Sequence, residues 1–242
     1  MLCKSRAIVL KTIKYSETSL VVKAYTEQFG LKSFLVRGVR KKHAKNSSNL
    51  FQPLNIIEVV FSEKQSTALI IPKEISLGYT YQSIPFDLYK SSVILFMNEL
   101  IYRSVHEEEA NNELFQLLYH FLVHIDNTQE RVANTHLVFS FHLTMHLGFF
   151  PLGSFSPEEP YFLLREGVFS KYSPHDELSL NQQESELLHL LVNAELENCH
   201  EIEISNQARN RMLEIIILYY QLHLIGFGEI KSLEVLNQVF HS

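Results

Sequence analysis

Residues 37–49 read RGVRKKHAKNSSN, a run that packs five fixed positive charges into nine residues and then becomes polar. The charged residues are Arg37, Arg40, Lys41, Lys42 and Lys45. Short apolar segments rich in β-branched residues lie on both sides of this run, which is the pattern of β-strands. The sequence therefore predicts a loop, named here the basic loop (residues 37–49), that projects from a β-sheet.

The segments around the basic loop predict a small barrel. Short apolar runs recur about every ten residues with polar turns between them, a spacing typical of an antiparallel barrel or sandwich. The predicted strands are residues 6–13, 19–26, 31–36, 54–61 and 67–71. Pro53 and Pro72 lie at strand ends, where a missing N–H is tolerated. With one long charged loop between the third and fourth strands, this order predicts an OB-fold barrel over residues 1–80.

After Pro85 the apolar residues recur with the period of helices. The predicted helices are residues 86–105, 113–125, 129 or 130 to 147, 181–193, 205–225 and 230–240. Gly148 is the expected C-cap of the third helix, and Ser205 is the expected N-cap of the fifth. Residues 149–176 are irregular and contain two strand-like pieces. The predicted fold class is therefore α+β: an OB-fold barrel, then a mainly α-helical domain over residues 81–242 with an irregular insert at 149–176.

Charge is divided unevenly between these two parts. Residues 1–80 hold 13 Lys and Arg against 5 Asp and Glu, a net charge of +8. Residues 81–242 hold 8 and 22, a net charge of −14, so the overall value of −6 conceals a strongly basic first third. Such an imbalance indicates that the barrel meets an anion and that the helical part does not.

The predicted anion is nucleic acid. OB-fold barrels bind single strands through a basic groove that follows the backbone and through aromatic rings that stack on bases. Phosphate contacts are predicted from the five charged residues of the basic loop together with Lys14 and Arg6. Tyr15 and Phe51 are predicted to stack on bases because they lie in polar turn sequence, with core packing as the alternative for each ring. For the loop, the alternative is a solvated charge run that protects a sheet edge.

Catalytic and metal-binding patterns are missing from the sequence. His120 with His124, and His142 with His146, are spaced to share a helical face, but neither pair has the Glu of the metalloprotease motif. There is no phosphate-binding glycine loop and no Gly-x-Ser-x-Gly elbow. We therefore predict no enzymatic activity, no cofactor and no bound metal.

Cysteine content and hydropathy indicate a cytoplasmic protein. The two cysteines, Cys3 and Cys199, are too few for a disulfide framework and suit a reducing compartment. The apolar run over residues 212–225 is interrupted by polar residues and is too short to span a bilayer. No membrane partner is predicted.

An ordered set of short motifs resembles the RecO family, the recombination mediators of bacterial DNA repair. The motifs are AIVL at 7–10, YSETS at 15–19, TEQFG at 26–30, RGVRKK at 37–42, QP at 52–53 and LGFFP at 147–151. The resemblance is sharpest at 37–42, where the family has a Gly-Ala-Arg-Lys-like segment. Together these motifs extend over nearly the whole chain.

The resemblance implies an N-terminal OB fold, a helical C-terminal domain and a nucleoid-associated protein. It implies binding of single-stranded and double-stranded DNA and annealing of complementary strands. It also implies help in replacing single-strand-binding protein by recombinase, together with the partner RecR. The acidic, apolar C-terminal tail of single-strand-binding protein is expected to dock in the helical domain. That docking requires cations beside an apolar pocket, for which the candidates are Arg103, Arg131, Arg165, Lys171, Arg209 and Arg211.

The chain departs from the family in one respect. Many members hold zinc with four cysteines after the Gly-Phe-x-Pro segment, whereas residues 148–176 contain no cysteine. Zinc is therefore not expected. Aromatic packing is expected to stabilise the insert instead, through Phe149, Phe150, Phe155, Tyr161, Phe162 and Phe169.

Two other functions fit the same residues. In the first, the basic loop docks an acidic protein and the chain is a protein-interaction adaptor. In the second, the OB-fold barrel binds RNA, because phosphate contacts alone do not distinguish the two sugars.

Overall fold

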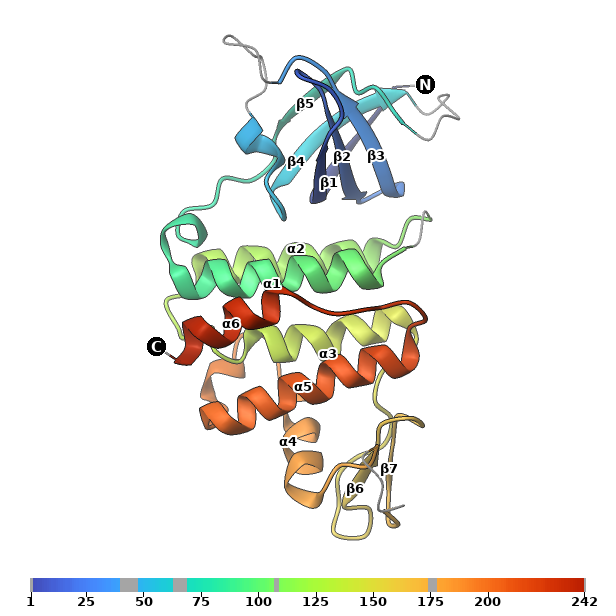
Figure 1. Ribbon diagram of the computed structural model, residues 1–242, viewed down its shortest axis with the longest axis vertical. Coiled ribbons are helices and arrows are strands. Elements are labelled where there is room, and N and C mark those ends of the chain that lie inside the picture. Colours follow the sequence, from blue (N-terminus) through green and yellow to red (C-terminus); the bar gives the residue numbers. More distant parts are fainter. Residues whose placement is uncertain (1, 40–47, 63–68, 107–108, 174–177, 242) are drawn as a thin grey trace. The chain divides into compact units, whose positions relative to one another are not determined.

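A computed structural model describes residues 2–39, 48–62, 69–106, 109–173 and 178–241 (Figure 1). The chain divides into two compact units. The barrel unit comprises Met1–Ser83 and Val105–Asp126, and the helical unit comprises Ile84–Ser104 and Asn127–Ser242. The domain boundary predicted at residue 80 stays a prediction, since the strands before it share their unit with a later segment.

Five strands form one antiparallel sheet in the barrel unit (Figure 1). They are β1 (Leu2–Lys14), β2 (Leu20–Thr26), β3 (Gly30–Val36), β4 (Ile56–Ser62) and β5 (Glu74–Leu77), in the sheet order β3-β2-β1-β4-β5. The long β1 pairs with β4 through its first half and with β2 through its second. The β1–β2 register shifts between Val9 and Lys11. Such irregularities bend a strand, which allows β1 to serve both neighbours.

A parallel bridge between Phe34 and Ile70 closes the sheet into a barrel. The Ile70 N–H donates to the Ser33 carbonyl at 2.9 Å, and the Ile70 carbonyl accepts from the Leu35 N–H at 2.8 Å. The core of the barrel is apolar and includes the buried residues Val9, Val22, Ala24, Phe34, Phe51, Ile57, Val59 and Phe61. The predicted five-stranded OB-fold barrel is confirmed.

The position of the fifth strand differs from the prediction. The sequence predicts a strand over residues 67–71, of which 67 and 68 lie outside the described residues. Ile70 forms only the isolated bridge, and the strand that pairs with β4 is β5, beyond Pro72. The prediction followed a continuous run of apolar residues. In β5, by contrast, only Ile75 is buried and the other residues are exposed.

Helix α2 (Asn112–Asn127) belongs to the barrel unit except for its last residue. It buries Leu114, Leu118 and Ile125 on one face. At its C-terminal end the buried Asp126 carboxylate accepts hydrogen bonds from the backbone N–H groups of Gln82 and Ser83 at 2.9–3.0 Å. This carboxylate therefore ties the chain after the last strand to α2.

The helical unit contains the remaining described helices and a small hairpin. They are α1 (Leu88–Ser104), α3 (Thr135–Leu147), α4 (Gln182–Val192), α5 (Asn206–His223), α6 (Ser232–His241), β6 (Tyr161–Leu163) and β7 (Val168–Ser170). The centre of the unit is α3, whose residues Leu137, Val138 and Phe139 are fully buried. This arrangement confirms the predicted mainly helical second part with an irregular insert. None of the described helices is long and apolar enough to cross a membrane.

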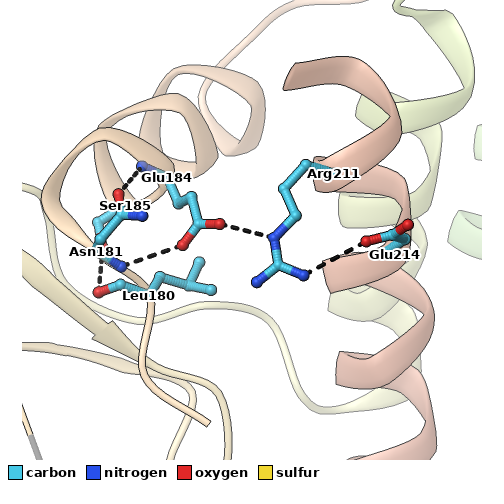
Figure 2. Close-up of polar contacts among 6 residues, drawn as sticks. All are labelled: Leu180, Asn181, Glu184, Ser185, Arg211 and Glu214. Atoms are coloured by element: carbon cyan, nitrogen blue, oxygen red, sulfur yellow. Dashed lines mark hydrogen bonds and ion pairs between the residues drawn. The ribbon is translucent and has the colours of Figure 1, made fainter. Parts of the chain in front are cut away.

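Local capping sets the ends of these helices. Gly148 has φ +83° and ends α3, and the Ser205 side chain accepts from the Ala208 N–H at the start of α5, as predicted. Helix α3 begins at Thr135 and not at residue 129 or 130, because the chain turns between Val132 and Thr135. Figure 2 shows the start of α4, where Asn181 and Glu184 form a reciprocal capping box.

Aromatic contacts hold the insert in place. The Phe149 ring stacks on His223 with centroids 5.1 Å apart, and Phe162 packs edge-on against Phe169 at 5.0 Å. The Tyr219 hydroxyl donates to the Phe149 carbonyl at 2.7 Å. These contacts confirm aromatic packing for Phe149, Phe162 and Phe169. Within the described residues, no group of three or more His, Cys, Asp or Glu could hold a metal ion.

Candidate nucleic-acid interface

The charged centre of the basic loop, with Arg40, Lys41, Lys42 and Lys45, lies outside the described residues. The structure does describe where this loop leaves the barrel. β3 ends at Val36, and the chain is held again at Val39, which is buried and donates its N–H to the Thr18 carbonyl at 3.1 Å. The start of the loop is therefore attached to the turn between β1 and β2.

The C-terminal flank of the basic loop is attached to the second half of β1. A short 3-10 helix, η1 (Ser48–Phe51), leads the chain back to the barrel. The Thr12 hydroxyl donates to the Phe51 carbonyl at 2.7 Å, and the Leu54 N–H donates to the Val9 carbonyl at 2.6 Å. One flank of the loop thus contacts the turn between β1 and β2, and the other contacts the second half of β1.

That end of the barrel carries three of the predicted DNA contacts. Lys14 pairs with Leu20, and Leu20 pairs with Val36, so the ends of β1 and β3 flank the start of β2 in one row. Lys14, Tyr15 and Arg37 extend from this row, and we name them the barrel-end site. Because Arg37 directly follows Val36, it joins Lys14 at this end.

All three side chains of the barrel-end site are exposed. Tyr15 is 61% exposed, which confirms its predicted exposure. Lys14 and Arg37 lie in solvent and have no ion-pair partner among the described residues. Ile13 is also 42% exposed; it was missed because an apolar strand residue gives no sequence signal of exposure. Cations and an exposed ring at one end of a barrel are elements of a single-strand site.

Arg6 has a different environment. Its Nε donates to Glu27 Oε2 at 2.9 Å, and its guanidinium lies 4.6 Å from the centre of the Tyr119 ring and 5.3 Å from that of Phe115. The ion pair lowers the pKa of Glu27 and raises that of Arg6. Arg6 also lies eight residues before Lys14, roughly 25 Å along an extended strand. These contacts count against Arg6 as a phosphate ligand.

Phe51 is buried, although the sequence predicted that its ring would be available to stack on a base. Its ring is 2% exposed and belongs to the barrel core with Val9 and Phe61. The polar sequence around it indicated a turn, and the turn exists as η1, but the turn directs this ring inward. A ring so buried offers no face to a base, so the stacking prediction is corrected for Phe51.

A large cavity lies in the helical unit. Its volume is about 1140 Å³. Arg131 and Arg209 line it together with the apolar residues Val132, Ile204 and Phe240. Two of the six cations predicted for tail docking therefore line the same cavity as apolar side chains. Lys90 also lines the cavity and was missed, because its place is set by contacts remote in sequence.

The other predicted docking cations lie elsewhere. Arg103 pairs with Glu99 at 3.1 Å, and Arg211 pairs with Glu184 at 2.8 Å and with Glu214 at 3.4 Å (Figure 2). Arg165 borders a smaller cavity of about 350 Å³ at the insert. Lys171 lies over the Tyr172 ring. These four therefore do not contribute to the large cavity.

Comparisons with known proteins match the whole chain. Residues 1–75 match the family model described as recombination protein O N terminal, and residues 85–234 match that described as recombination protein O C terminal. Proteins named DNA repair protein RecO from Flavobacterium psychrophilum and Bacteroides fragilis are each 38% identical to the chain, and the one from Phocaeicola vulgatus is 35% identical. Each match includes 99% of this chain and all of the relative. With both family models matched in order and relatives aligned from end to end, this chain belongs to the RecO family.

Proposed function

We propose that this chain is a non-enzymatic mediator of recombinational DNA repair that binds single-stranded and double-stranded DNA at the barrel end. The observation that supports the proposal is the barrel-end site: Lys14, Tyr15 and Arg37 are exposed at one end of the barrel, and neither cation has a carboxylate partner among the described residues. The basic loop starts and returns at the same end of the barrel. The four charges of the loop beyond Arg37 would add to those of the site. The relatives named DNA repair protein RecO support the repair context.

Binding of this kind is electrostatic and has little sequence preference. Lys and Arg neutralise phosphates and release counterions, while an exposed Tyr stacks on any base. If about five phosphates are neutralised, single-strand affinity falls with salt with a log–log slope of roughly −3.5. Annealing follows because a cationic surface screens two backbones and leaves the base edges free to pair. No step requires a reacting side chain.

Charge reversal in the basic loop tests this proposal. The variant Arg40→Glu, Lys41→Glu, Lys42→Glu is expected to bind single-stranded DNA about a hundredfold more weakly at low salt and to lose annealing. The matched control is Arg165→Glu, Lys171→Glu, Lys231→Glu, which makes the same change in net charge in the helical unit. Fluorescence anisotropy measures binding, and circular dichroism checks the fold. Equal loss in both variants, or none in the first, would contradict the assignment.

Two further binding measurements separate the alternative functions. A protein-interaction adaptor would bind an acidic protein equally well in the presence of oligonucleotides. An RNA-binding barrel would prefer an RNA strand to a DNA strand of equal length. If the chain is the proposed DNA mediator, oligonucleotides should compete with an acidic protein for binding. Its affinity for an RNA strand should not exceed that for a DNA strand of equal length.

We also propose that the cavity of the helical unit docks the C-terminal tail of single-strand-binding protein. Arg131 and Arg209 offer charge to an acidic peptide, and Val132 and Phe240 offer an apolar surface. Docking there would bring the barrel to DNA covered by single-strand-binding protein, where recombinase loading with RecR takes place. In this proposal the protein acts in the cytoplasm, associated with the nucleoid.

A further inference from the structure

The last described helix, α6, is seated on a narrow apolar stripe. It packs against α1 (Figure 1). Among its described side chains, the buried apolar ones are Leu236 and Val239, whereas Val235 is exposed. The central helix α3, by contrast, is buried along most of its length. A helix held by so little apolar surface opens more easily than the helix at the centre of the unit.

Buried polar atoms without hydrogen-bond partners gather around α6. His136 of α3 contacts the Phe240 ring of α6, with ring centroids 5.9 Å apart, and neither of its ring nitrogens has a partner among the described residues. The same is true of Ser232 Oγ, at the first residue of α6, and of Asn98 Oδ1 on α1. All of these atoms belong to α6 itself or to the two helices that it contacts. Each has lost water without gaining a partner, which weakens the seating of α6.

The N-terminal end of α6 is nevertheless held firmly. The Ser232 N–H donates to Glu99 Oε2 of α1 at 2.7 Å. A carboxylate is favourable at this position because a helix N-terminus carries partial positive charge. Just before the helix, Phe227 and Ile230 are both buried. The chain is therefore fixed up to the point where α6 begins.

The C-terminal end of α6 is held by weaker contacts. Phe240 lies against the Tyr89 ring, with centroids 5.3 Å apart, and against the unsatisfied ring of His136. The Phe240 carbonyl accepts a hydrogen bond from Asn206 Nδ2 that is long, at 3.4 Å. Phe240, Tyr89 and Asn206 all line the large cavity of the helical unit. The loosely held end of α6 is thus part of the cavity wall.

We propose that α6 is a hinged gate, which pivots at Ser232 and swings its C-terminal end away from α3. In the closed state Phe240 contacts His136 and lines the cavity. In the open state the ring nitrogens of His136 gain hydrogen bonds from water, which offsets part of the lost apolar contact. Opening extends the cavity to the His136 ring. The gate depends neither on DNA binding nor on which ligand the cavity takes.

Native-state hydrogen exchange of the full-length protein, resolved by residue, measures the opening. The amides of residues 236–240 should exchange about a hundredfold faster than those at the centre of α3, because α6 opens alone and α3 exchanges only when the unit unfolds. Protection of the α6 amides as strong as that of the α3 amides would overturn the proposal.

The variant His136→Phe tests the role of the unsatisfied ring. It removes both nitrogens and keeps an aromatic ring against Phe240, so exchange in α6 should slow about tenfold. The matched control is His142→Phe, the same substitution on the same helix, at a ring that is hydrogen-bonded to the backbone of Ala194. The control should leave exchange in α6 unchanged. Equal slowing by both variants would overturn the gate, because it would reflect the stability of the whole unit.

The variant Phe240→Ala tests the loosely held end independently. Exchange in α6 should quicken about tenfold. His136 should also react faster with diethyl pyrocarbonate, which acylates imidazoles that reach solvent. The control Val235→Ala shortens an exposed side chain of the same helix and should change neither rate. Equal effects of the two variants, or no faster reaction of His136 in Phe240→Ala, would contradict the gate.

Failure of the gate is distinguishable from failure of the proposed function. DNA annealing by Phe240→Ala should equal that of the wild type, because the variant does not touch the barrel-end site. If α6 proves as protected as α3, the gate falls while DNA binding stands. If α6 opens as expected and the wild type does not anneal DNA, only the proposed function falls.

Discussion

The barrel unit and the helical unit use arginine in contrasting ways. Arg37 of the barrel lies in solvent with no described partner, whereas Arg211 of the helical unit lies between two carboxylates (Figure 2). Each unit also has an exception. Arg6 of the barrel is locked by Glu27 and aromatic rings, and Arg209 of the helical unit has only neutral partners. The net charge of a region therefore does not decide which of its cations can bind; the partners of each one do.

The aromatic rings of the barrel also differ in their surroundings. Substitutions of these rings are expected to have the largest effect on the free energy of unfolding. Phe51 lies in the core, so Phe51→Ala should reduce the free energy of unfolding by about 3–5 kcal/mol. Tyr15 lies in solvent, so Tyr15→Ala should change it by less than about 0.5 kcal/mol. Urea unfolding measures both. Equal costs for the two substitutions would break the distinction between the rings.

The next effect separates Arg6 from Arg37. Arg6→Ala removes an ion pair and a ring contact, and should reduce the free energy of unfolding by about 2 kcal/mol with little change in DNA affinity. Arg37→Ala should do the reverse, leaving stability unchanged and weakening DNA binding. Chemical denaturation and strand anisotropy on both variants measure the two effects. A large affinity loss in a folded Arg6→Ala protein would restore Arg6 as a phosphate ligand.

A smaller effect is expected inside the helical unit, at His136. Its ring is 1% exposed between Phe96 and Phe240, and neither ring nitrogen has a described hydrogen-bond partner. Burial, with a contribution from the charge of Arg209, lowers the pKa of His136 to about 3. The unfolded chain takes up this proton near pH 6.5 and the folded chain does not, so stability falls as pH drops below that value.

The substitution His136→Phe should therefore raise stability by about 1 kcal/mol at pH 7, since it removes an unsatisfied buried group. It should also flatten the loss of stability between pH 6.5 and pH 4.5, a loss of at most about 1.4 kcal/mol per pH unit for one group. Thermal unfolding at several pH values measures both. An unchanged pH profile would show that His136 is protonated in the folded protein.

Much of the fold could be predicted because its signals are local. Strand and helix periods, Gly148 and Ser205 act within a few residues of where they stand, and the structure follows them. Predictions failed where contacts between residues far apart in the sequence determine the position of a strand or a side chain. Residues 74–77 pair with β4 although only Ile75 among them is buried, and Phe51 turns inward from a polar segment.

The candidate sites divide in the same way. The exposure of Tyr15 followed from its turn sequence, and the position of Lys14 and Arg37 at one end of the barrel followed once the strands were in register. The surroundings of Arg209 could not be predicted, because its partners come from the residue before α3, from α5 and from the chain between α4 and α5. No sequence pattern distinguishes an arginine held by amides from one held by carboxylates.

The salt dependence of single-strand binding tests the barrel-end site most directly. For the wild type, a plot of log affinity against log salt should have a slope of roughly −3.5, and for Lys14→Ala, Arg37→Ala a slope of roughly −2, because each lost phosphate contact removes about 0.7. The matched control Arg165→Ala, Lys231→Ala should keep the wild-type slope. An unchanged slope in the barrel variant, or an equal change in the control, would contradict DNA binding at the barrel end.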